Sequence, residues 1–324
     1  MRIVVIGLGS MGKRRIGLLK ELGEKEIVGV DTSEDRRLSA EKELGILTSN
    51  SLDDSLSNST YDCAFICTSP LSHGEIIKSC LTEGLHVFTE INLIDNLYEE
   101  NMRIASEKGL VLFLSSTFLY RNEIDWLIQR VGKTNSKYNY IYHVGQYLPD
   151  WHPWESYNNF FVADKRTNAC REIFAIELPW IITCFGDIKN VSCQKDRITS
   201  LNLSFPDNYL IQVVHENGTK GLLAVDVVSR KSVRRLELFN EEEYLVWNGG
   251  DSSIKVFNVE KKVDEVLSFK ARHDDRYATF INESPYLEEI KSFFASIDKK
   301  EQPKWSFEKD LKMLHLIDEL EEEQ

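Results

Sequence analysis

The sequence predicts an α/β protein of two domains. An N-terminal doubly wound parallel sheet is followed by an α+β domain built on a mostly antiparallel sheet. The chain has 324 residues, too many for one small domain. Its first 115 residues alternate continuously apolar strands with amphipathic helices, as parallel sheets covered on both faces do. After about residue 135, short strands follow one another through tight turns. We therefore expect domains over residues 1–119 and 120–324.

The apolar runs of the first domain place its strands and helices. Five buried strands are expected at 2–6, 27–31, 64–67, 87–88 and 110–114. Amphipathic periodicity places helices at about 11–22, 73–82 and 95–107.

The second domain follows a different pattern. Its strands are expected at 137–149, 199–205, 208–215, 219–229, 233–239, 243–247 and 252–258. Glu216-Asn217-Gly218 and Asn248-Gly249-Gly250-Asp251 are hairpin signals between them. A strongly apolar helix is expected at about 171–185, and two helices close the chain at about 284–297 and 307–322.

Charge and composition exclude several classes of function. The net charge of −13 gives the protein no general attraction for phosphate backbones, so we expect no nucleic-acid partner. No membrane partner is expected either, because no stretch approaches the roughly 20 apolar residues of a membrane helix. Residues 2–6 start the chain as a strand rather than a signal peptide. Five of the six cysteines sit in apolar segments, which favours buried, reduced thiols in a cytoplasmic protein. Cys63 and Cys67 lack a second ligand pair, so no metal is expected.

A glycine-rich motif follows the first strand and opens the first helix. The residues Gly7, Gly9 and Gly12, with Ser10 and Met11 between them, form G-x-G-x-x-G in the strand–turn–helix context that makes this pattern informative. The first glycine permits the tight turn, the second lets the backbone approach a pyrophosphate, and the third lets helix and strand pack closely. The sequence therefore predicts a Rossmann dinucleotide site.

The residue that ends the second strand addresses the choice of cofactor. Asp31 lies 19 residues after Gly12, where a carboxylate accepts hydrogen bonds from ribose hydroxyls and repels a 2′-phosphate. This favours NAD. NADP remains an alternative, because Arg36 and Arg37 follow closely and can host a phosphate.

Several further segments resemble the glucose–fructose oxidoreductase and inositol dehydrogenase family (Gfo/Idh/MocA). Cys67-Thr68-Ser69-Pro70-Leu71-Ser72-His73 resembles the family's strand, small-residue turn and helix start, which implies cofactor contacts at Thr68 and Ser69. The segment from Thr82 to Glu90 resembles its "EAGKHVxxEKP" stretch and implies that Glu90 borders the nicotinamide half of the cofactor. Phe185-Gly186-Asp187 and the closing helices also fit. The resemblance implies a nicotinamide-dependent oxidoreductase of a sugar or polyol, assembled as a homodimer or homotetramer.

The chain departs from this family where the usual proton-transfer groups stand. Ile91 and Asn92 occupy the Lys and Pro positions of Glu-Lys-Pro. Aligning Glu177-Leu178 with a common "SHELDY" version puts Ile176 at the His and Pro179 at the Asp. Isoleucine neither titrates nor donates a hydrogen bond, so the chain resembles a divergent member of the family that lacks its catalytic Lys and His.

Polar residues of the second domain are the remaining candidates. Gln146-Tyr147-Leu148-Pro149-Asp150-Trp151-His152-Pro153-Trp154 resembles a "YLPDWHP" stretch of members linked to surface-sugar biosynthesis. His152 is our candidate for proton transfer, because its ordinary pKa lies nearest neutrality. Arg171 is expected to hold an anionic substrate group, with Glu172 beside it as a catalytic residue that orients it. The alternative for this pair is a salt-bridge network at the start of the helix.

A second group of side chains completes the expected substrate site. Tyr147 and Trp151 are expected against the sugar, and Glu177 needs a partner if it is buried. Tyr120 follows the last strand of the parallel sheet, where ligands of such sheets bind. We expect these residues to line a cleft with the nicotinamide end of the cofactor, where Ile91 and Ile176 form an apolar floor.

Two functions fit these observations. The first is an NAD-dependent oxidoreductase of a sugar or sugar-derived substrate, in which the polar stretch 146–154 and the pair Arg171-Glu172 replace the usual groups. The alternative is a catalytically degenerate protein that binds NAD and a sugar as a sensor or partner, which Ile91 and Ile176 favour. A homo-oligomer is expected through the second-domain sheet, because residues 222–228 are apolar on both faces apart from Asp226.

Overall fold

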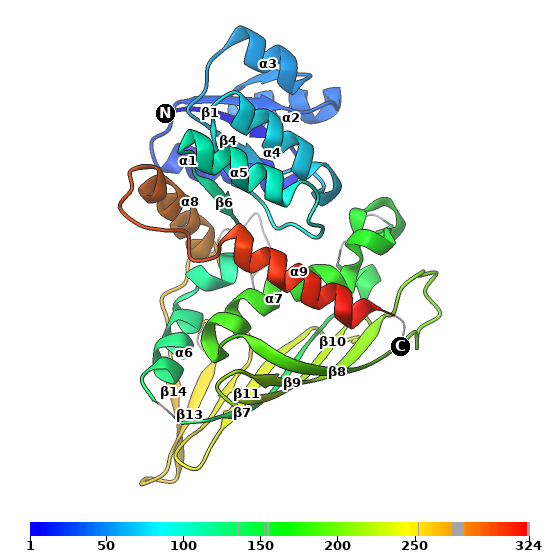
Figure 1. The fold of residues 1–324 in the computed structure, drawn as a ribbon, viewed down its shortest axis with the longest axis vertical. Helices are drawn as coiled ribbons and strands as arrows, with labels where there is room; N and C mark the ends of the chain where they lie inside the picture. Colours follow the sequence, from blue (N-terminus) through cyan, green and yellow to red (C-terminus); the bar gives the residue numbers. More distant parts are fainter. Residues whose placement is uncertain (135, 152, 154–155, 252, 274–281, 323–324) are drawn as a thin grey trace. The chain divides into compact units, whose positions relative to one another are not determined.

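A computed structural model describes the chain except residues 135, 152, 154–155, 252, 274–281 and 323–324 (Figure 1). Contacts between residues divide the chain into two units. The first comprises Met1–Thr117 and Tyr286–Leu314, and the second comprises Phe118–Pro285 and His315–Gln324.

The first unit contains a six-stranded, all-parallel sheet, which confirms the expected doubly wound domain. Its strand order is β3-β2-β1-β4-β5-β6, with β1 at Arg2–Ile6, β2 at Glu26–Val30, β3 at Leu47–Ser49, β4 at Cys63–Ile66, β5 at His86–Thr89 and β6 at Leu112–Leu114. Because β2 and β4 flank β1, the order reverses at β1, and ligands of such sheets bind at the carboxyl ends of the strands there. The sequence did not predict β3, which is short and has Leu47 77% exposed.

Helices cover this sheet on both faces. They are α1 at Ser10–Glu21, α2 at Glu34–Leu44, α3 at Leu52–Asn58, α4 at His73–Thr82 and α5 at Tyr98–Lys108. A stack of aromatic rings fills the core over the central strands. Phe88 lies between Phe65 and Phe113, with ring centroids 4.8 and 5.2 Å away.

The closing helices do not all stay with the second unit, to which the sequence assigned them. Helix α8, Ser284–Ile297, places Phe293 edge-on against Phe65 and Phe88 of the first sheet, at 5.4 and 5.7 Å. Helix α9, Phe307–Glu321, divides between the two units after Leu314. An amphipathic pattern shows that one face of a helix is buried, but not which sheet covers it. The domain boundary between residues 119 and 120 stays a prediction.

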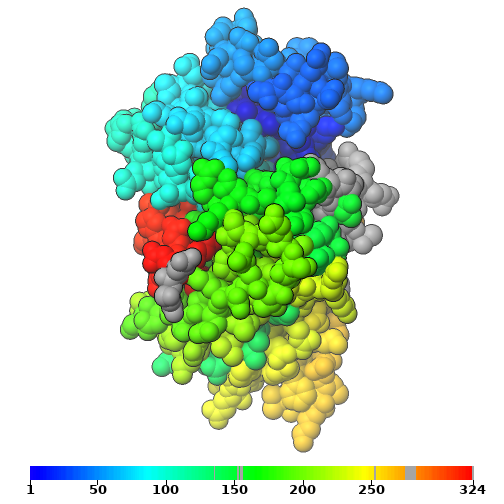
Figure 2. Space-filling view, turned by 90° about the vertical axis from the view of Figure 1, so that its right-hand side faces the viewer, coloured from blue at the N-terminus to red at the C-terminus, as the bar shows by residue number. Residues whose placement is uncertain are grey.

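The second unit contains an eight-stranded sheet of order β14-β13-β12-β11-β7-β10-β9-β8, which is antiparallel except where β7 meets β10. Its strands are β7 at Asn139–Gly145, β8 at Ile188–Asp196, β9 at Asn208–His215, β10 at Lys220–Asp226, β11 at Val233–Phe239, β12 at Tyr244–Trp247, β13 at Ile254–Asn258 and β14 at Val263–Leu267. The α+β class is thus confirmed. The yellow to orange hairpin β13–β14 projects from the rest of this unit in Figure 2.

One predicted element of this unit was wrong, and three elements were not predicted. The expected strand at 199–205 is a bend, because the Asp207 carboxylate accepts hydrogen bonds from the amides of Ile198 and Thr199 and folds the segment back. Strands β8 and β14 were missed, since both are edge strands with many exposed polar residues. Helix α6, Asn122–Gly132, was also missed.

Helix α7, Ala169–Phe185, lies along one face of this sheet, here called the inner face (Figure 1). Phe185, at its end, stacks on Tyr140 with ring centroids 4.4 Å apart. Glu177, two turns earlier, accepts a hydrogen bond from Tyr142. The helix therefore runs antiparallel to β7, and its N-terminal turns lie towards the carboxyl end of that strand.

The opposite face of the second sheet is open in the chain described here. Ile141, Leu210 and Leu222 are 44%, 59% and 53% exposed, and they lie on adjacent strands. No helix among the described residues is both long and apolar enough to cross a bilayer.

Candidate active site and cofactor site

The backbone around the glycine motif needs its glycines for different reasons. Gly7 has φ +93°, and a Cβ there would lie 2.6 Å from the Cys67 carbonyl oxygen. A Cβ on Gly12 would lie 1.8 Å from the carbonyl oxygen of Gly7. A Cβ on Gly9 would meet nothing within 4 Å. The outer glycines thus let strand and helix approach, and Gly9 leaves open space for a bound group.

The start of α1 suits an anion. Gly9 is the N-cap, no side chain caps the helix, and its first turn carries no acidic residue. The amide of Lys13 makes a helical hydrogen bond to the Gly9 carbonyl, so the amides of Ser10, Met11 and Gly12 precede the regular ladder. Together with the helix dipole, they fit a pyrophosphate.

Asp31 is held at the carboxyl end of β2 beside this loop. One carboxylate oxygen accepts from the Leu8 amide and the other from the Ser33 amide, both at 2.8 Å. Each oxygen keeps a lone pair for a ribose hydroxyl. The guanidinium of Arg36 is 3.7 Å from the carboxylate and largely exposed, so the structure leaves the NADP alternative open.

Thr68 and Ser69 form the turn after β4, as expected. The ring of His73 fixes this turn, because Nε2 lies 3.0 Å from the Thr68 carbonyl oxygen and Nδ1 lies 2.7 Å from Oδ1 of Asn92. Burial lowers the pKa of His73, and the contacts of its two ring nitrogens give it a structural role in this turn. Asn92, at the family's proline position, therefore contributes a hydrogen bond to the cofactor-side turn.

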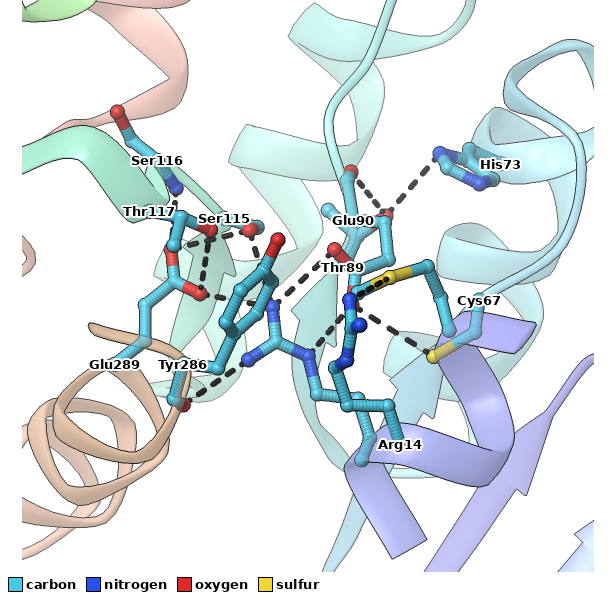
Figure 3. A network of polar contacts seen from close by, with 12 residues as sticks. Arg14, Cys67, His73, Thr89, Glu90, Ser115, Ser116, Thr117, Tyr286 and Glu289 are labelled. Carbon is cyan, nitrogen blue, oxygen red and sulfur yellow. Dashed lines mark hydrogen bonds and ion pairs between the residues drawn. The ribbon is translucent and has the colours of Figure 1, made fainter. Parts of the chain in front are cut away.

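Glu90 is anchored by a residue that the sequence did not single out. Arg15, fully buried on α1, donates to Glu90 from Nε at 2.7 Å and from Nη2 at 3.2 Å, and to Glu289 of α8 at 2.8 Å. Glu289 also accepts from the Ser116 amide and the Ser115 hydroxyl (Figure 3). Although burial acts to lower the pKa of Arg15, the two carboxylates raise it well above its ordinary value. Glu90 is thus positioned by a buried charge network.

Glu177 has the partners that a buried carboxylate needs. One oxygen accepts from Tyr142 at 2.6 Å and Trp180 at 2.7 Å, and the other accepts from Nε and Nη2 of Arg234 at 3.0 and 2.8 Å. Its side chain is 2% exposed. These contacts attach α7 to the sheet, so the geometry gives Glu177 a structural role rather than the expected contact with substrate.

Arg171 forms ion pairs within the second unit. Its guanidinium donates to Asp318 at 2.7 Å and to Glu321 at 2.6 Å, both on α9, and its side chain is 6% exposed. The salt-bridge alternative therefore describes Arg171 better than anion binding, with α9 rather than Glu172 supplying the carboxylates.

Glu172 differs from both of its charged neighbours on α7. Within the described chain, its carboxyl has no hydrogen-bond or ion-pair partner, and burial raises its pKa to about 7. It lies four residues before Ile176, so the two side chains share one face of the helix. A carboxyl that titrates near neutral pH is suited to accept and return a proton.

The segment after β7 is tied to the loop after β10. The Tyr147 amide donates to the Ser229 carbonyl at 2.7 Å, and the Leu148 amide donates to Val227 at 3.0 Å. The Trp151 indole donates to the Gln146 carbonyl, which fixes its ring within the segment. His152 lies outside the described residues. Tyr120 ends the short helix Thr117–Tyr120 and is half-buried.

Helix geometry places the first turns of α7 towards the end of β7 from which this segment leaves. From Glu177, which bonds Tyr142, the helix rises about 7.5 Å to Glu172, and β7 advances about 10 Å from Tyr142 to Gly145. Both advance in the same direction. The backbone at Glu172 thus lies towards the same end of β7 as Tyr147 and the loop after β10, and the Glu172 side chain points about 140° round the helix from that of Glu177. Among the described residues, no group of three or more His, Cys, Asp and Glu side chains is arranged to hold a metal.

Comparison with known proteins identifies the first domain. Residues 1–115 match the model of the Gfo/Idh/MocA oxidoreductase family, described as having an NAD-binding Rossmann fold. Biliverdin reductase A of Mus musculus is 31% identical over 135 residues, which are 40% of this chain and 44% of that protein. Myo-inositol 2-dehydrogenase of Thermotoga maritima is 28% identical over 120 residues, 36% of each chain. The matched segments span less than half the length of these relatives.

Solved structures extend the similarity to the whole fold. UDP-N-acetylglucosamine 3-dehydrogenase GnnA of Acidithiobacillus ferrooxidans has a TM-score of 0.79 and 16% identity, covering 99% of this chain and 96% of its own. The WlbA dehydrogenase of Bordetella pertussis, in complex with NADH and UDP-GlcNAcA, has a TM-score of 0.78 and 15% identity, covering 98% and 94%. The expected cofactor class and family are confirmed: the N-terminal domain, residues 1–115, belongs to the Gfo/Idh/MocA oxidoreductases and is their NAD-binding Rossmann fold.

Proposed function

We propose that the protein is an NAD-dependent oxidoreductase that acts on a CH–OH group of a sugar-derived substrate, with Glu172 as its proton-transfer group. The observation that carries the proposal is the Glu172 carboxyl, partnerless in the described chain and with a pKa raised to about 7. It takes the place that we expected His152 to hold.

The reaction requires such a group. When NAD is bound, its nicotinamide accepts the hydride from the carbinol carbon. The hydroxyl proton must leave as the hydride leaves, because a retained proton would put positive charge on the new carbonyl oxygen. Ionised Glu172 accepts that proton during oxidation, and its protonated form returns it during reduction. Ile91 and Ile176, at the positions of the family's Lys and His, supply no proton-transfer group.

The sugar-like substrate rests on similarity and on the polar segment. GnnA is named as a dehydrogenase of UDP-N-acetylglucosamine, and WlbA was solved with UDP-GlcNAcA. Biliverdin reductase A, by contrast, is named for another substrate, so sequence similarity alone does not select a sugar. The stretch Gln146–Trp151, held against the loop after β10, supports a substrate site in the second unit. Cytoplasmic location remains a prediction from the buried cysteines.

A steady-state assay of NAD reduction with a panel of sugars, sugar acids and nucleotide sugars tests the function. With a turned-over substrate, Glu172→Gln should lower kcat by about 10² to 10⁴ and leave NADH affinity nearly unchanged. Glu216→Gln, on the exposed turn between β9 and β10, is the matched control and should retain full activity. Full activity of Glu172→Gln would reject the assignment.

A non-catalytic function is the alternative that specific residues support. Ile91 and Ile176 also fit a protein that binds NAD and a sugar without turning the sugar over. If NADH binds, a sugar ligand copurifies and no substrate changes NADH absorbance, this alternative is the better description.

A further inference from the structure

A cationic segment of the second unit runs from the connection between β10 and β11 into β11. Residues 230–235, here the basic segment, carry four cations in a protein of net charge −13. Arg234 is paired with Glu177 and Arg235 with Glu237. Arg230 and Lys231 are exposed, and neither has a carboxylate partner among the residues that the structure describes. Two adjacent positive charges are therefore available to an anion.

Arg230 is oriented rather than loose. Its guanidinium carbon lies 3.8 Å from the centre of the Tyr147 ring, in cation–π contact. A guanidinium stacked on a ring keeps its N–H groups at its edge, where they can donate in pairs to a phosphate or carboxylate. Tyr147 is itself fixed by the hydrogen bond from its amide to Ser229.

The turn that carries the two cations is held by Asp226 at the end of β10. This carboxylate accepts from the amides of Val228 and Ser229 at 2.9 and 2.8 Å, and from the Ser229 hydroxyl at 3.0 Å. Its other neighbour is Nε2 of His143, at 2.7 Å. Arg230 thus begins directly after a turn with a defined backbone.

The location of the turn connects it with the proposed proton-transfer group. Strands β7 and β10 are parallel, so their carboxyl ends meet at one edge of the sheet, and residues 146–151 and 227–232 leave from that edge. The first turns of α7, with Glu172, lie towards the same edge. The helix turn that carries Glu172 and the turn that carries the two cations thus lie towards the same edge of the second sheet.

We propose that Arg230 and Lys231 bind a phosphate group of the substrate, which makes the substrate class a phosphate-bearing sugar. This deepens the proposed function and rests on it for the identity of the site. Two neighbouring cations match a group of about two negative charges, which a phosphate monoester or a diphosphate linkage supplies and a single carboxylate does not. An uncharged sugar would give the pair no counter-charge.

Calorimetric titration of NAD-loaded protein tests the proposal without turnover, and saturating NAD keeps the probes out of the cofactor site. The probes are glucose, glucose 1-phosphate, UDP-glucose and UDP. The phosphate-bearing probes should bind, and glucose should bind at least tenfold more weakly. Arg230→Ala/Lys231→Ala should weaken the phosphate-bearing probes by about 10- to 100-fold, and Arg230→Lys should weaken them less. Lys189→Ala, which removes one exposed charge from β8, should bind them as the parent does.

The outcomes separate the two sources of phosphate and the two proposals. If UDP and UDP-glucose bind more tightly than glucose 1-phosphate, the substrate is a nucleotide-linked sugar. If glucose 1-phosphate binds more tightly, the substrate is a simple sugar phosphate. Undiminished binding by the folded double variant, or no binding of any phosphate probe to NAD-loaded protein, overturns the inference. Phosphate binding does not require Glu172, so Glu172→Gln should bind the probes as the parent protein does. The binding result therefore holds whether or not Glu172→Gln lowers kcat.

Discussion

Arg171 and Glu172 are neighbours on α7, but their charges are used in different places. Arg171 donates to Asp318 and Glu321 of α9 at 2.7 and 2.6 Å. Glu172 receives no such contact in the described chain, and burial raises its pKa to about 7. An adjacent cation that was free to pair would have lowered that pKa. The pairing of Arg171 with α9 is therefore part of what leaves Glu172 able to titrate near neutral pH.

The glycine loop makes a contrasting pair of predictions. Gly9→Ala should leave the unfolding free energy nearly unchanged, because its Cβ would meet no atom within 4 Å, yet weaken NADH binding by about tenfold or more, because the methyl group fills the pyrophosphate space. Gly12→Ala should destabilise the fold, since its Cβ would lie 1.8 Å from the Gly7 carbonyl oxygen. Urea unfolding and NADH titration of both variants provide the check. Unchanged NADH affinity in Gly9→Ala would contradict the assigned cofactor position.

Asp31 should set the preference between the two nicotinamide cofactors. Its carboxylate lies beside the glycine loop and would repel a 2′-phosphate, so the parent protein should bind NADH more tightly than NADPH. Asp31→Asn removes the charge, keeps one acceptor for the backbone amides, and should narrow the difference. Titration with NADH and with NADPH measures the difference in affinity. Equal affinities in the parent protein would contradict the position of Asp31 at the ribose hydroxyls.

Replacing Arg15 should destabilise the first unit. Arg15→Leu leaves the carboxylates of Glu90 and Glu289 without their shared cation, and breaking a buried pair in this way costs about 3–5 kcal/mol. Arg103→Leu removes an exposed pair with Glu107 and should cost less than about 1 kcal/mol. Equal losses in chemical unfolding would show that the buried network contributes no more than a surface pair.

The open face of the second sheet should bury itself in a homo-oligomer, as the sequence suggested. Leu210 and Leu222 are more than half exposed, and a large bare apolar face is uncommon on a monomer. Light scattering at micromolar concentration should give a dimer or tetramer mass, and Leu210→Lys/Leu222→Lys should shift it towards the monomer. A parent protein of monomer mass would defeat this prediction.

Local signals in the sequence predicted the backbone geometry around the glycine motif, while its contacts with the cofactor stay a prediction. The glycine spacing, the strand before it and Asp31 lie within the first 31 residues, so their arrangement follows from the single unit β1–α1–β2. The contacts of Glu90 did not follow in this way. Its partner Arg15 lies 75 positions away, and the Arg15–Glu289 pair spans 274 positions, so only the folded chain brings them together.

The second unit shows the same limit. Glu177 and Glu172 both read as acids on an apolar helix, and the spacing did not distinguish them. Tyr142 and Arg234, on two strands of the sheet, pair with Glu177, whereas Glu172 has no such partner in the described chain. Arg230 was passed over because the sequence did not reveal that it stacks on Tyr147.

The titration of Glu172 is the most direct test of the account. Because its folded pKa of about 7 lies above the ordinary value of 4.5, the folded protein holds the proton more tightly, and the carboxyl's contribution to stability is lost as pH rises through 7. Asp310, with a pKa raised by burial to about 6, titrates in the same range. It titrates equally in the parent and in Glu172→Gln, so its effect cancels when the two are compared. Unfolding free energies of the parent and Glu172→Gln should therefore be compared between pH 4.5 and 8. We predict that the unfolding free energy of Glu172→Gln rises relative to that of the parent by up to about 3 kcal/mol as pH rises. A difference between the two proteins that stays constant over this range would show that Glu172 titrates normally and would contradict its role as the proton-transfer group.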